Sequence, residues 1–366
     1  MTKVTVLTAV YNAELYLRQC LDSLAAQTLP DCQYICIDDA STDNSPAILD
    51  EYAQRDSRFQ IIHLPENQGL AAARNNGLRQ AEGQFVTMLD SDDWLAPDTL
   101  ETAYRALLET PQADIALLRL VRYNQQDGTT HVQELSLPKT KNLLTGYEAF
   151  LLSIDNWKIH GLYLVRRTIH QQYPYDETTS VYSDENTTHI HYLHARHVVI
   201  SQAPYYYRIH QQSVTHRISI HYFDRLESNY SLKRQLLDEA GKGWLADTKD
   251  VLDRYEVHRW LNIVDACWYL YLHQDDFTPD QQRDIHQRIA THLHTIETRR
   301  LSLRLKCKPG YMPVKHYPIF HLLENTYFRL KIFLQRQSQP KEQREQCRTT
   351  FEHCRVVTEE DKVNEG

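Results

Sequence analysis

The sequence predicts an α/β fold with a largely parallel β-sheet and helices on both of its faces. Two observations point to it. Short β-rich runs alternate with stretches of helical periodicity through the first 120 residues, and polar turn-forming residues separate them. Repeated βα units of this kind build parallel sheets. The chain has 366 residues, of which 42% are hydrophobic and 24% charged. This composition excludes wholesale disorder and a polytopic membrane protein.

Two βα units open the chain. Val4–Val10 is rich in Val and Thr, as strands are, and leucines then recur at roughly helical spacing over residues 15–24. The apolar run at 34–38 is the next expected strand. The polar residues at 39–45 can cap a helix that begins at Pro46, because proline suits the first turn of a helix.

The alternation continues to residue 118. Residues 59–64 form the third expected strand, which ends at a break containing Pro and Gly, and residues 70–78 form the next helix. A fourth strand at 84–89 ends in a cluster of aspartates. A helix at 98–109 and a strand at 114–118 complete the pattern, so the first third of the chain is expected to fold as one sheet.

Carboxylates follow two of these strands. Asp38 and Asp39 end one, and Asp90, Asp92 and Asp93 end another. Ligands of open α/β sheets collect beyond the carboxyl ends of the strands. A nucleotide phosphate needs a bridging divalent cation beside so many carboxylates, and the carboxylates themselves repel one another without one. We therefore expect Mg²⁺ or Mn²⁺ here. The alternative is that these aspartates only form turns and cap helices.

Four segments carry a family resemblance through their order and spacing. They are Val-Thr-Val-Leu-Thr-Ala-Val-Tyr-Asn at 4–12, Ile-Asp-Asp-Ala-Ser-Thr-Asp at 37–43, Asn-Gln-Gly-Leu-Ala-Ala-Ala-Arg-Asn at 67–75 and Leu-Asp-Ser-Asp-Asp at 89–93. Together they resemble the inverting glycosyltransferases of family 2, which have the GT-A fold. The resemblance implies transfer of a sugar from a nucleoside diphosphate, with UDP expected, to a hydroxyl of a glycan or glycolipid. It also implies a place in cell-surface polysaccharide or lipopolysaccharide assembly.

The resemblance assigns roles at the end of the fourth strand. In that family an Asp-x-Asp element binds the ribose and the metal on the sugar nucleotide. Asp92 would then ligate the metal, Asp90 would hold the ribose or the metal, and Ser91 between them would face the donor. Arg74 would approach the base or the diphosphate.

The same resemblance places the nucleotide base at the ends of the first two strands. Asp39, or its neighbour Asp38, would accept a hydrogen bond from the base, in a pocket lined by Ala9 and Tyr11. Two positions depart from the family pattern, which usually has Pro in place of Ala9 and Gly in place of Ala40.

Inverting transfer needs a general base to take the proton of the acceptor hydroxyl, and a carboxylate suits this role. Tyr-Ser-Asp-Glu-Asn-Thr-Thr at 182–188 resembles the family's base segment, with Asp184 as the expected base and Glu185 in reserve. The alternative is that these acids only stabilise a helix N-terminus, where negative charge is favoured. Both roles are compatible.

The segment at 204–214 resembles the family's closing segment, which has aromatics and a basic residue. Arg208 is expected on the diphosphate, and Tyr206, Tyr207 and His210 could contact the diphosphate or the acceptor. Alternatively the tyrosines are half-buried sheet residues. Upstream, four histidines at 189–197 lack the spacing of a zinc site, so a helix face is the preferred interpretation.

Two other functions stay open. A sugar-nucleotide pyrophosphorylase also uses an α/β sheet with acidic metal ligands. It should carry a Gly-rich loop with Arg after its first strand, where this chain has Tyr-Asn-Ala-Glu at 11–14. A non-catalytic nucleotide-binding or scaffold protein on the same fold is the second alternative. Such a protein should tolerate the loss of Asp92 and Asp184.

We expect three parts. Residues 1–220 form the catalytic domain, with a nucleotide-sugar-binding half at 1–120 and an acceptor half at 121–220. Residues 221–335 form a helical appendage, because their apolar residues turn to helical spacing. The polar tail at 336–366 is expected to be disordered.

The appendage is locally basic, although the formal net charge of the chain is −8. Between residues 299 and 336 one acid, Glu324, stands among nine Lys and Arg. The apolar stripe at 319–334 within this stretch indicates a basic amphipathic helix. It could lie on an anionic membrane, or pack against the protein or a second subunit.

The overall acidity argues against nucleic acid as a partner. The seven cysteines show neither zinc nor disulfide spacing, and neither a leader nor a membrane span is evident. A cytoplasmic protein, with peripheral contact at the inner face of the membrane, is therefore expected.

Overall fold

The computed structural model describes the chain except for residues 139, 156, 180, 211–217, 308–309 and 339–366. The chain divides into two compact units, Met1–Tyr255 and a second one that begins at Glu256. The division falls inside a continuous helix, α9 (Thr248–His273). The first unit holds the sheet, and the second is built from helices.

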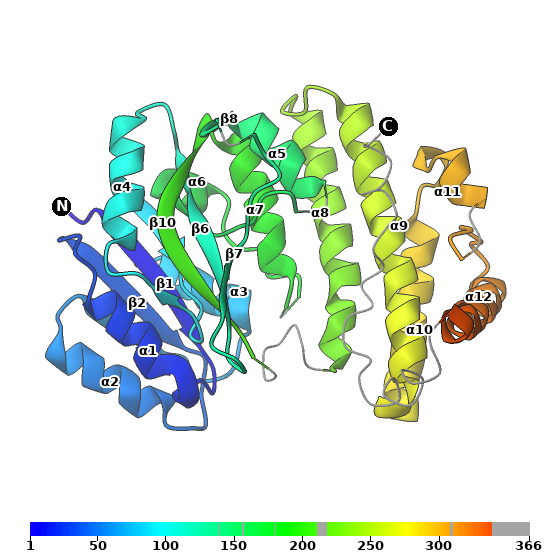
Figure 1. Cartoon of the computed structure of the whole chain (residues 1–366), viewed down its shortest axis with the longest axis horizontal. Coiled ribbons are helices and arrows are strands. Elements are labelled where there is room, and N and C mark those ends of the chain that lie inside the picture. The colour runs from blue at the N-terminus through cyan, green and yellow to red at the C-terminus, as the bar shows by residue number, and fades with distance from the viewer. Residues whose placement is uncertain (139, 156, 180, 211–217, 308–309, 339–366) are drawn as a thin grey trace. The chain divides into compact units, whose positions relative to one another are not determined.

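One mixed sheet forms the centre of the first unit (Figure 1). Its strands follow the order β3-β2-β1-β4-β9-β6-β10-β5, while β7 pairs with β6 and β8 with β10. The strands are β1 (Val4–Val10), β2 (Cys32–Asp38), β3 (Phe59–His63), β4 (Phe85–Met88), β5 (Trp94–Leu95), β6 (Ile115–Asn124), β7 (Thr130–Val132), β8 (Leu143–Thr145), β9 (Tyr163–Arg166) and β10 (His197–Ile209).

Strand directions bring many carboxyl ends to one edge of the sheet. β1 pairs in parallel with β2 and β4, β2 with β3, and β6 with β10. β9 is antiparallel to both β4 and β6, so the two reversals restore the original direction. β1, β2, β3, β4, β6 and β10 therefore all end at the same edge. The predicted α/β sheet is confirmed, and the reversed β9 in its middle is an addition to it.

Helices cover both faces of the sheet (Figure 1). Those of the first unit are α1 (Glu14–Ala25), α2 (Ser45–Arg55), α3 (Leu70–Leu78), α4 (Thr99–Glu109), α5 (Gly146–Ile154), α6 (Arg167–Gln172), α7 (Ser183–His194), α8 (Asp224–Gly241) and the start of α9. Alternate residues of β1 enter different clusters, because side chains alternate across a strand. Val6 belongs to the same buried cluster as Leu17 of α1, and Leu7 to the same buried cluster as Ala73 of α3.

Helix α3 lies unusually close to the sheet. A Cβ added at Gly77 would lie 2.6 Å from Cδ1 of Ile37 on β2, which is too short for a real contact. Glycine at this position lets the helix settle against β1 and β2. The close packing fixes the N-terminus of α3 beside the carboxyl ends of these strands.

The first unit reaches beyond residue 220, the expected end of the catalytic domain. Buried residues of α8 and α9, among them Leu232, Leu236 and Tyr255, join the same cluster as Ile115 of β6 and Leu193 of α7. The first helices of the expected appendage thus share a core with the sheet. The functional halves at 1–120 and 121–220 stay a prediction.

The second unit confirms the expected helices of the C-terminal part. After α9 come α10 (Pro279–Thr295), α11 (Leu303–Cys307) and α12 (Tyr317–Ser338). Trp260 of α9 packs against Phe320 of α12, and both are fully buried. Among the described residues, the structure has no helix with the length and apolarity needed to cross a membrane. Residues 339–366, most of the expected tail, lie outside the described residues.

Candidate functional site

The turn after β2 holds two carboxylates against the backbone. Oδ1 and Oδ2 of Asp39 accept hydrogen bonds from the amides of Gln68 (2.7 Å) and Gly69 (2.9 Å), at the start of α3. Gly69 has a φ of 87°, which lets the chain turn there without a Cβ clash. Asp39 is 3% exposed. Its carboxylate therefore ties the end of β2 to the N-terminus of α3.

Asp38 is held in a similar way. Its Oδ1 accepts a bond from the amide of Ser41 (3.0 Å), and its Oδ2 lies 2.9 Å from Nδ1 of His63 at the end of β3. Nε2 of His63 lies 3.1 Å from Asp50. The hydrogen bond to Asp38 raises the pKa of His63, and that to Asp50 adds to the rise. When His63 is protonated, it links two acids.

The residues expected to line the base pocket lie at the ends of β1 and β2. Ala9 is paired with Ile37 across the two strands, and Tyr11 directly after β1 is 53% exposed. Oδ1 of Asn12 accepts a bond from the amide of Thr42 (2.8 Å), which fastens the two turns together. The exposed Tyr11 ring thus stands beside the strand ends, as a wall residue of a pocket would.

The turn after β4 carries the other carboxylates, and side chains rather than amides hold the first of them. Oδ1 of Asp90 lies 2.6 Å from Nη2 of Arg74, a residue of α3 that is only 2% exposed. The Arg74 guanidinium also lies over the Tyr175 ring, 5.4 Å from its centroid. Helix α3 therefore meets both acidic turns: the two amides just before it bind Asp39, and Arg74 within it binds Asp90.

Asp92 and Asp93 point to different surroundings. Oδ2 of Asp92 lies 2.9 Å from Nε2 of His210, and its side chain is 31% exposed. Asp93 is 1% exposed and accepts bonds from the Tyr205 hydroxyl and the Arg208 amide, both at 2.8 Å. Burial raises the pKa of the Asp93 carboxyl well above its usual value, and the nearby Asp90 and Asp92 add to the rise. Asp93 is therefore tied into the protein interior, while the Asp92 side chain is partly exposed.

Arg208 is enclosed beneath this turn. Its Nε donates to the main-chain oxygen of Asp92 (2.8 Å), and its terminal nitrogens donate to Gln125 (2.5 Å) and Gln19 (2.6 Å). Its guanidinium lies over the Tyr16, Trp94 and Tyr123 rings. Arg208 is 4% exposed. It supports the turn, and its expected contact with a diphosphate stays a prediction.

The tyrosines of β10 divide between core and half-buried positions. Tyr205 is fully buried, whereas Tyr206 is half-buried and stacks on Trp94 at a centroid distance of 5.0 Å. Tyr207 is half-buried too. The alternative of half-buried sheet residues is therefore confirmed for Tyr206 and Tyr207.

The expected base lies at the start of α7. The backbone of Asp184 belongs to this helix, but its side chain lies outside the described residues. Glu185 is exposed. Tyr182, just before the helix, has a φ of 71°. Asn186 anchors the first turn, because its Nδ2 donates to Asp176 (2.7 Å) and to the main-chain oxygen of Ser228 (3.0 Å).

Sequence analysis missed the link between α3 and the segment before α7. Nδ2 of Asn75 donates to the main-chain oxygen of Tyr175 (2.9 Å) and to Glu177 (2.6 Å), while its Oδ1 accepts from the Tyr175 amide (2.9 Å). The signal was present, since Asn75 ends one of the resemblance segments beside Arg74. Its partners are about 100 residues away, beyond the reach of local patterns.

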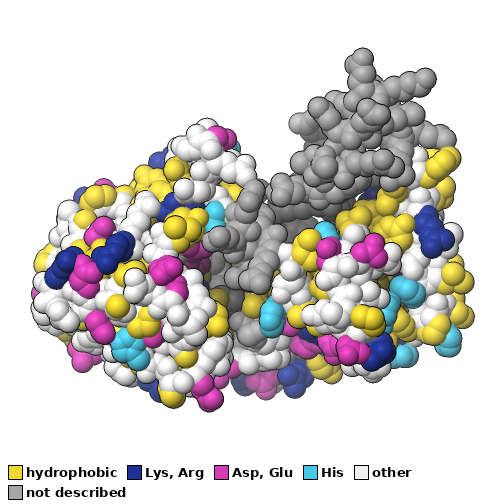
Figure 2. Space-filling view, turned by 90° about the horizontal axis from the view of Figure 1, so that it is seen from below, with side chains coloured by type: hydrophobic (Ala, Val, Ile, Leu, Met, Phe, Trp, Pro, Cys, Tyr) yellow, Lys and Arg dark blue, Asp and Glu magenta, His cyan; other side chains and the backbone are white. Residues whose placement is uncertain are grey.

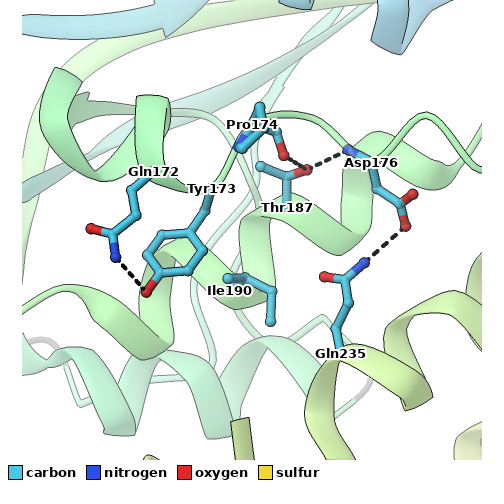
Figure 3. Close-up of a pocket in the computed structure, with 7 residues that line it drawn as sticks. All are labelled: Gln172, Tyr173, Pro174, Asp176, Thr187, Ile190 and Gln235. Atoms are coloured by element: carbon cyan, nitrogen blue, oxygen red, sulfur yellow. Dashed lines mark hydrogen bonds between the residues drawn. The ribbon is translucent and has the colours of Figure 1, made fainter. Parts of the chain in front are cut away.

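A pocket of about 200 Å³ lies beside this segment. Figure 3 shows the residues around it: Gln172, Tyr173, Pro174, Asp176, Thr187, Ile190 and Gln235. Their polar groups bond to one another; Gln235 donates to Asp176 (3.0 Å), and the amide of Asp176 donates to Thr187 (3.1 Å). Among the side chains that the structure describes, no predicted site residue lines this pocket.

The histidines of α7 have partners within the protein. His189 lies 2.9 Å from Oγ of Ser153, and His191 lies 2.9 Å from the Tyr163 hydroxyl. His194 lies 2.9 Å from Glu239. Within the described part of the chain, no group of three or more His, Cys, Asp or Glu side chains is arranged to hold a metal ion.

Comparisons with known proteins agree with the geometry. A model of the family described as "Glycosyl transferase family 2" matches residues 5–173. "Putative glycosyltransferase EpsH" of Bacillus subtilis is 32% identical over 267 residues, which span 69% of this chain and 74% of that protein. The glycosyltransferase GlyG of Streptococcus pneumoniae is 28% identical over 58% of this chain and 72% of its own length.

Among solved structures, residues 1–349 of Staphylococcus aureus TarS share the fold, with a TM-score of 0.65 at 21% identity. The likeness covers 90% of this chain and 92% of that chain. It supports the GT-A architecture expected from the sequence. The family match and the identity over most of EpsH show more: the chain belongs to glycosyl transferase family 2.

Proposed function

We propose that this glycosyltransferase moves a sugar from a UDP-sugar, with inversion and with help from Mn²⁺ or Mg²⁺, to a hydroxyl of a glycan or lipid-linked acceptor. We further propose that it serves cell-surface polysaccharide synthesis at an anionic membrane, which it contacts through residues 299–336. The observation that carries the proposal is the β4 turn. There, the side chains of Arg74 and His210 hold Asp90 and Asp92 at the edge where the parallel strands end.

The relatives favour UDP as the nucleotide. The TarS fragment has been solved in complex with UDP and with UDP-GlcNAc. The sequence of TarS, a poly(ribitol-phosphate) beta-N-acetylglucosaminyltransferase, is 29% identical over 57% of this chain and 35% of its own. A UDP-sugar donor and a cell-surface polymer as acceptor are thus the expectations to test first.

The donor would lie across the strand ends. We place the base beside Tyr11 and Ala9, within reach of Asp38 and Asp39, and the ribose beside Asp90 and Ser91. Arg74 already neutralises part of the charge of Asp90 at 2.6 Å. Approach of Arg74 to the base or diphosphate, and a contact between Arg208 and a phosphate, complete the proposed donor site.

The side chains at the β4 turn fit a divalent cation. Carboxylate oxygens suit Mg²⁺ and Mn²⁺, which are often bound through one or two carboxylates together with substrate phosphates and water. Asp92 is part-exposed, and its Oδ1 has no hydrogen-bond partner among the described residues, while His210 orients Oδ2. Asp92 would be the main ligand and Asp90 the second. When bound, the cation would offset the charge that develops on the leaving diphosphate.

Asp184 is the proposed base, with Glu185 in reserve. Its carboxylate would take the proton of the acceptor hydroxyl as the oxygen attacks the anomeric carbon from the face opposite the diphosphate. Attack from that face inverts the configuration. The position at the start of α7 supports this assignment, because Asn186 and Asn75 anchor the segments on either side of Tyr182.

Calorimetric titration of UDP, GDP and CDP into the purified protein, first with Mn²⁺ and then with EDTA, tests the donor site. We expect UDP to bind in Mn²⁺ and to lose most of its affinity in EDTA. Binding of another nucleotide alone would overturn the choice of UDP. The absence of binding by all three would favour the non-catalytic scaffold.

A further inference from the structure

Helix α12 presents an apolar stripe to solvent. Six large hydrophobic side chains on it are between 42% and 66% exposed: Ile319, Leu322, Leu323, Leu330, Phe333 and Leu334. Their spacing of three and four residues puts them on one side of the helix. The opposite side is buried within the second unit through Phe320 and Phe328. A patch of this size is uncommon on a soluble monomer and marks an interaction surface.

Positive charge borders the stripe. Arg329 is exposed on the same side of α12, and Arg304 is exposed on α11. The chain from 299 to 336 contains one acid, Glu324, which is 1% exposed. Burial raises the pKa of Glu324 to about 8, so at neutral pH it adds little negative charge. Figure 2 shows hydrophobic and basic side chains side by side over the C-terminal helices, at the right of the view.

The apolar stripe and the positive charge beside it indicate the kind of partner. In a symmetric contact between two copies, the same patch lies on both sides, so its cations would meet a second basic patch and no exposed acid of α12. An anionic lipid surface offers what the stripe needs: acyl chains for the apolar residues and negative headgroups for the cations. The charge therefore favours lipid over a second copy.

We propose that α12 lies flat on an anionic membrane, with the stripe from Ile319 to Leu334 in the boundary between headgroups and acyl chains. The inference rests on the proposed function, in which the acceptor is lipid-linked, and it names the surface that makes the membrane contact. Docking would keep the enzyme on the membrane that carries its acceptor, so that successive acceptors are met by diffusion in two dimensions.

Flotation of the full chain with lipid vesicles tests the inference. One set of vesicles is phosphatidylcholine alone, and the other contains one quarter phosphatidylglycerol. We expect the protein to float with the anionic vesicles and to bind the neutral ones about ten-fold more weakly. Raising the salt concentration should weaken the anionic binding, because salt screens headgroup charge.

Matched variants locate the contact. The double change Leu322→Gln and Phe333→Gln should weaken binding to the anionic vesicles by about ten-fold or more, because two exposed apolar anchors are lost. Arg329→Gln should weaken it about five-fold. Leu108→Gln, at a side chain of α4 that is 55% exposed, is the control and should bind like the unchanged protein.

UDP titration of the same samples separates this inference from the proposed function, since vesicle binding requires neither donor nor turnover. A protein that binds UDP but ignores anionic vesicles would overturn the membrane surface alone. Equal binding by the double variant and the unchanged protein would do so too. A dimer that the double variant breaks, seen by light scattering without lipid, would assign the stripe to a second copy instead.

Discussion

The two acidic strand ends of the first unit hold their carboxylates in different ways. After β2, backbone amides of Gln68, Gly69 and Ser41 occupy oxygens of Asp39 and Asp38. After β4, the side chains of Arg74 and His210 hold Asp90 and Asp92. A hydrogen bond from a backbone amide cannot be given up without moving the main chain, whereas a side-chain partner can rotate away. Both oxygens of Asp39 are therefore fixed by the backbone, whereas the side chains that hold Asp90 and Asp92 could give way to a ligand.

The largest expected effect is at the turn after β4, where side chains hold the carboxylates. Asp92→Asn should abolish metal-dependent UDP binding and turnover, because the proposed main ligand loses its charge. Calorimetry in Mn²⁺ measures the binding, and product formation measures the turnover. Asp114→Asn, just before β6, is the control, because Asp114 bonds to Arg166 and Arg196 and not to any residue of the proposed metal site. Unchanged activity in Asp92→Asn would remove Asp92 from the metal site.

Replacing the proposed base should separate binding from chemistry. Asp184→Asn should keep UDP binding while turnover falls by about 10²-fold or more, the usual loss for a general base. Single-turnover kinetics with saturating donor measure the fall. If UDP binding were lost along with turnover, Asp184 would instead have a structural role in the donor site. Glu185→Gln is the matched comparison, and a greater fall there would transfer the role to Glu185.

A change at the turn after β2, where backbone amides hold Asp39, should lower the stability of the fold. Asp39→Asn replaces a carboxylate oxygen with an NH₂ group that faces backbone donors, so we expect the free energy of unfolding to fall by about 1.5–3 kcal/mol. Urea denaturation should show the same loss in Mn²⁺ and in EDTA, since no metal is involved. Asp98→Asn, at an exposed aspartate without a side-chain cap bond, should change little. A loss at Asp39 that appears only with Mn²⁺ would contradict this division.

The smallest effect concerns pH at the β2 end. Asp38 raises the pKa of His63 in the folded protein, so the pair stabilises the fold fully below the unfolded value near 6.5. That stability is lost as pH rises through the higher folded pKa. The His63 side chain is 42% exposed, so solvent screens the pair and we expect a loss below about 1 kcal/mol. Between pH 6 and 9, the denaturation midpoint should depend less on pH in His63→Gln than in the unchanged protein. An equal dependence in both would assign the effect to another group.

Local patterns predicted the first half of the sheet well. Val4–Val10 was recognised because its residue types favour strands, and the helix at 70–78 because a break containing Pro and Gly precedes it. Strand β9 was not predicted, because its four residues show too little pattern. Its pairing with β4 also depends on partners about 80 residues away. β5, with two residues, is weaker still.

The site divides in the same way. The strand-end aspartates could be found because they follow apolar runs. Their partners could not, because His210 and Asp92 are 118 residues apart and Arg208 reaches Gln19 across 189 residues. Such contacts arise only when the sheet brings β10 beside the β4 turn. Sequence therefore located the acids, and the fold determined what each acid touches.

The turn after β2 also bears on how this chain could be adapted. Ala40 has a φ of 58°, in the left-handed region where an alanine costs about 1 kcal/mol more than a glycine. Glycine is the residue that the family usually has here, and it would relieve this cost. It would also give the unfolded chain more freedom, which offsets part of the gain. Position 40 thus offers a way to change the rigidity of this turn without altering any carboxylate of the site.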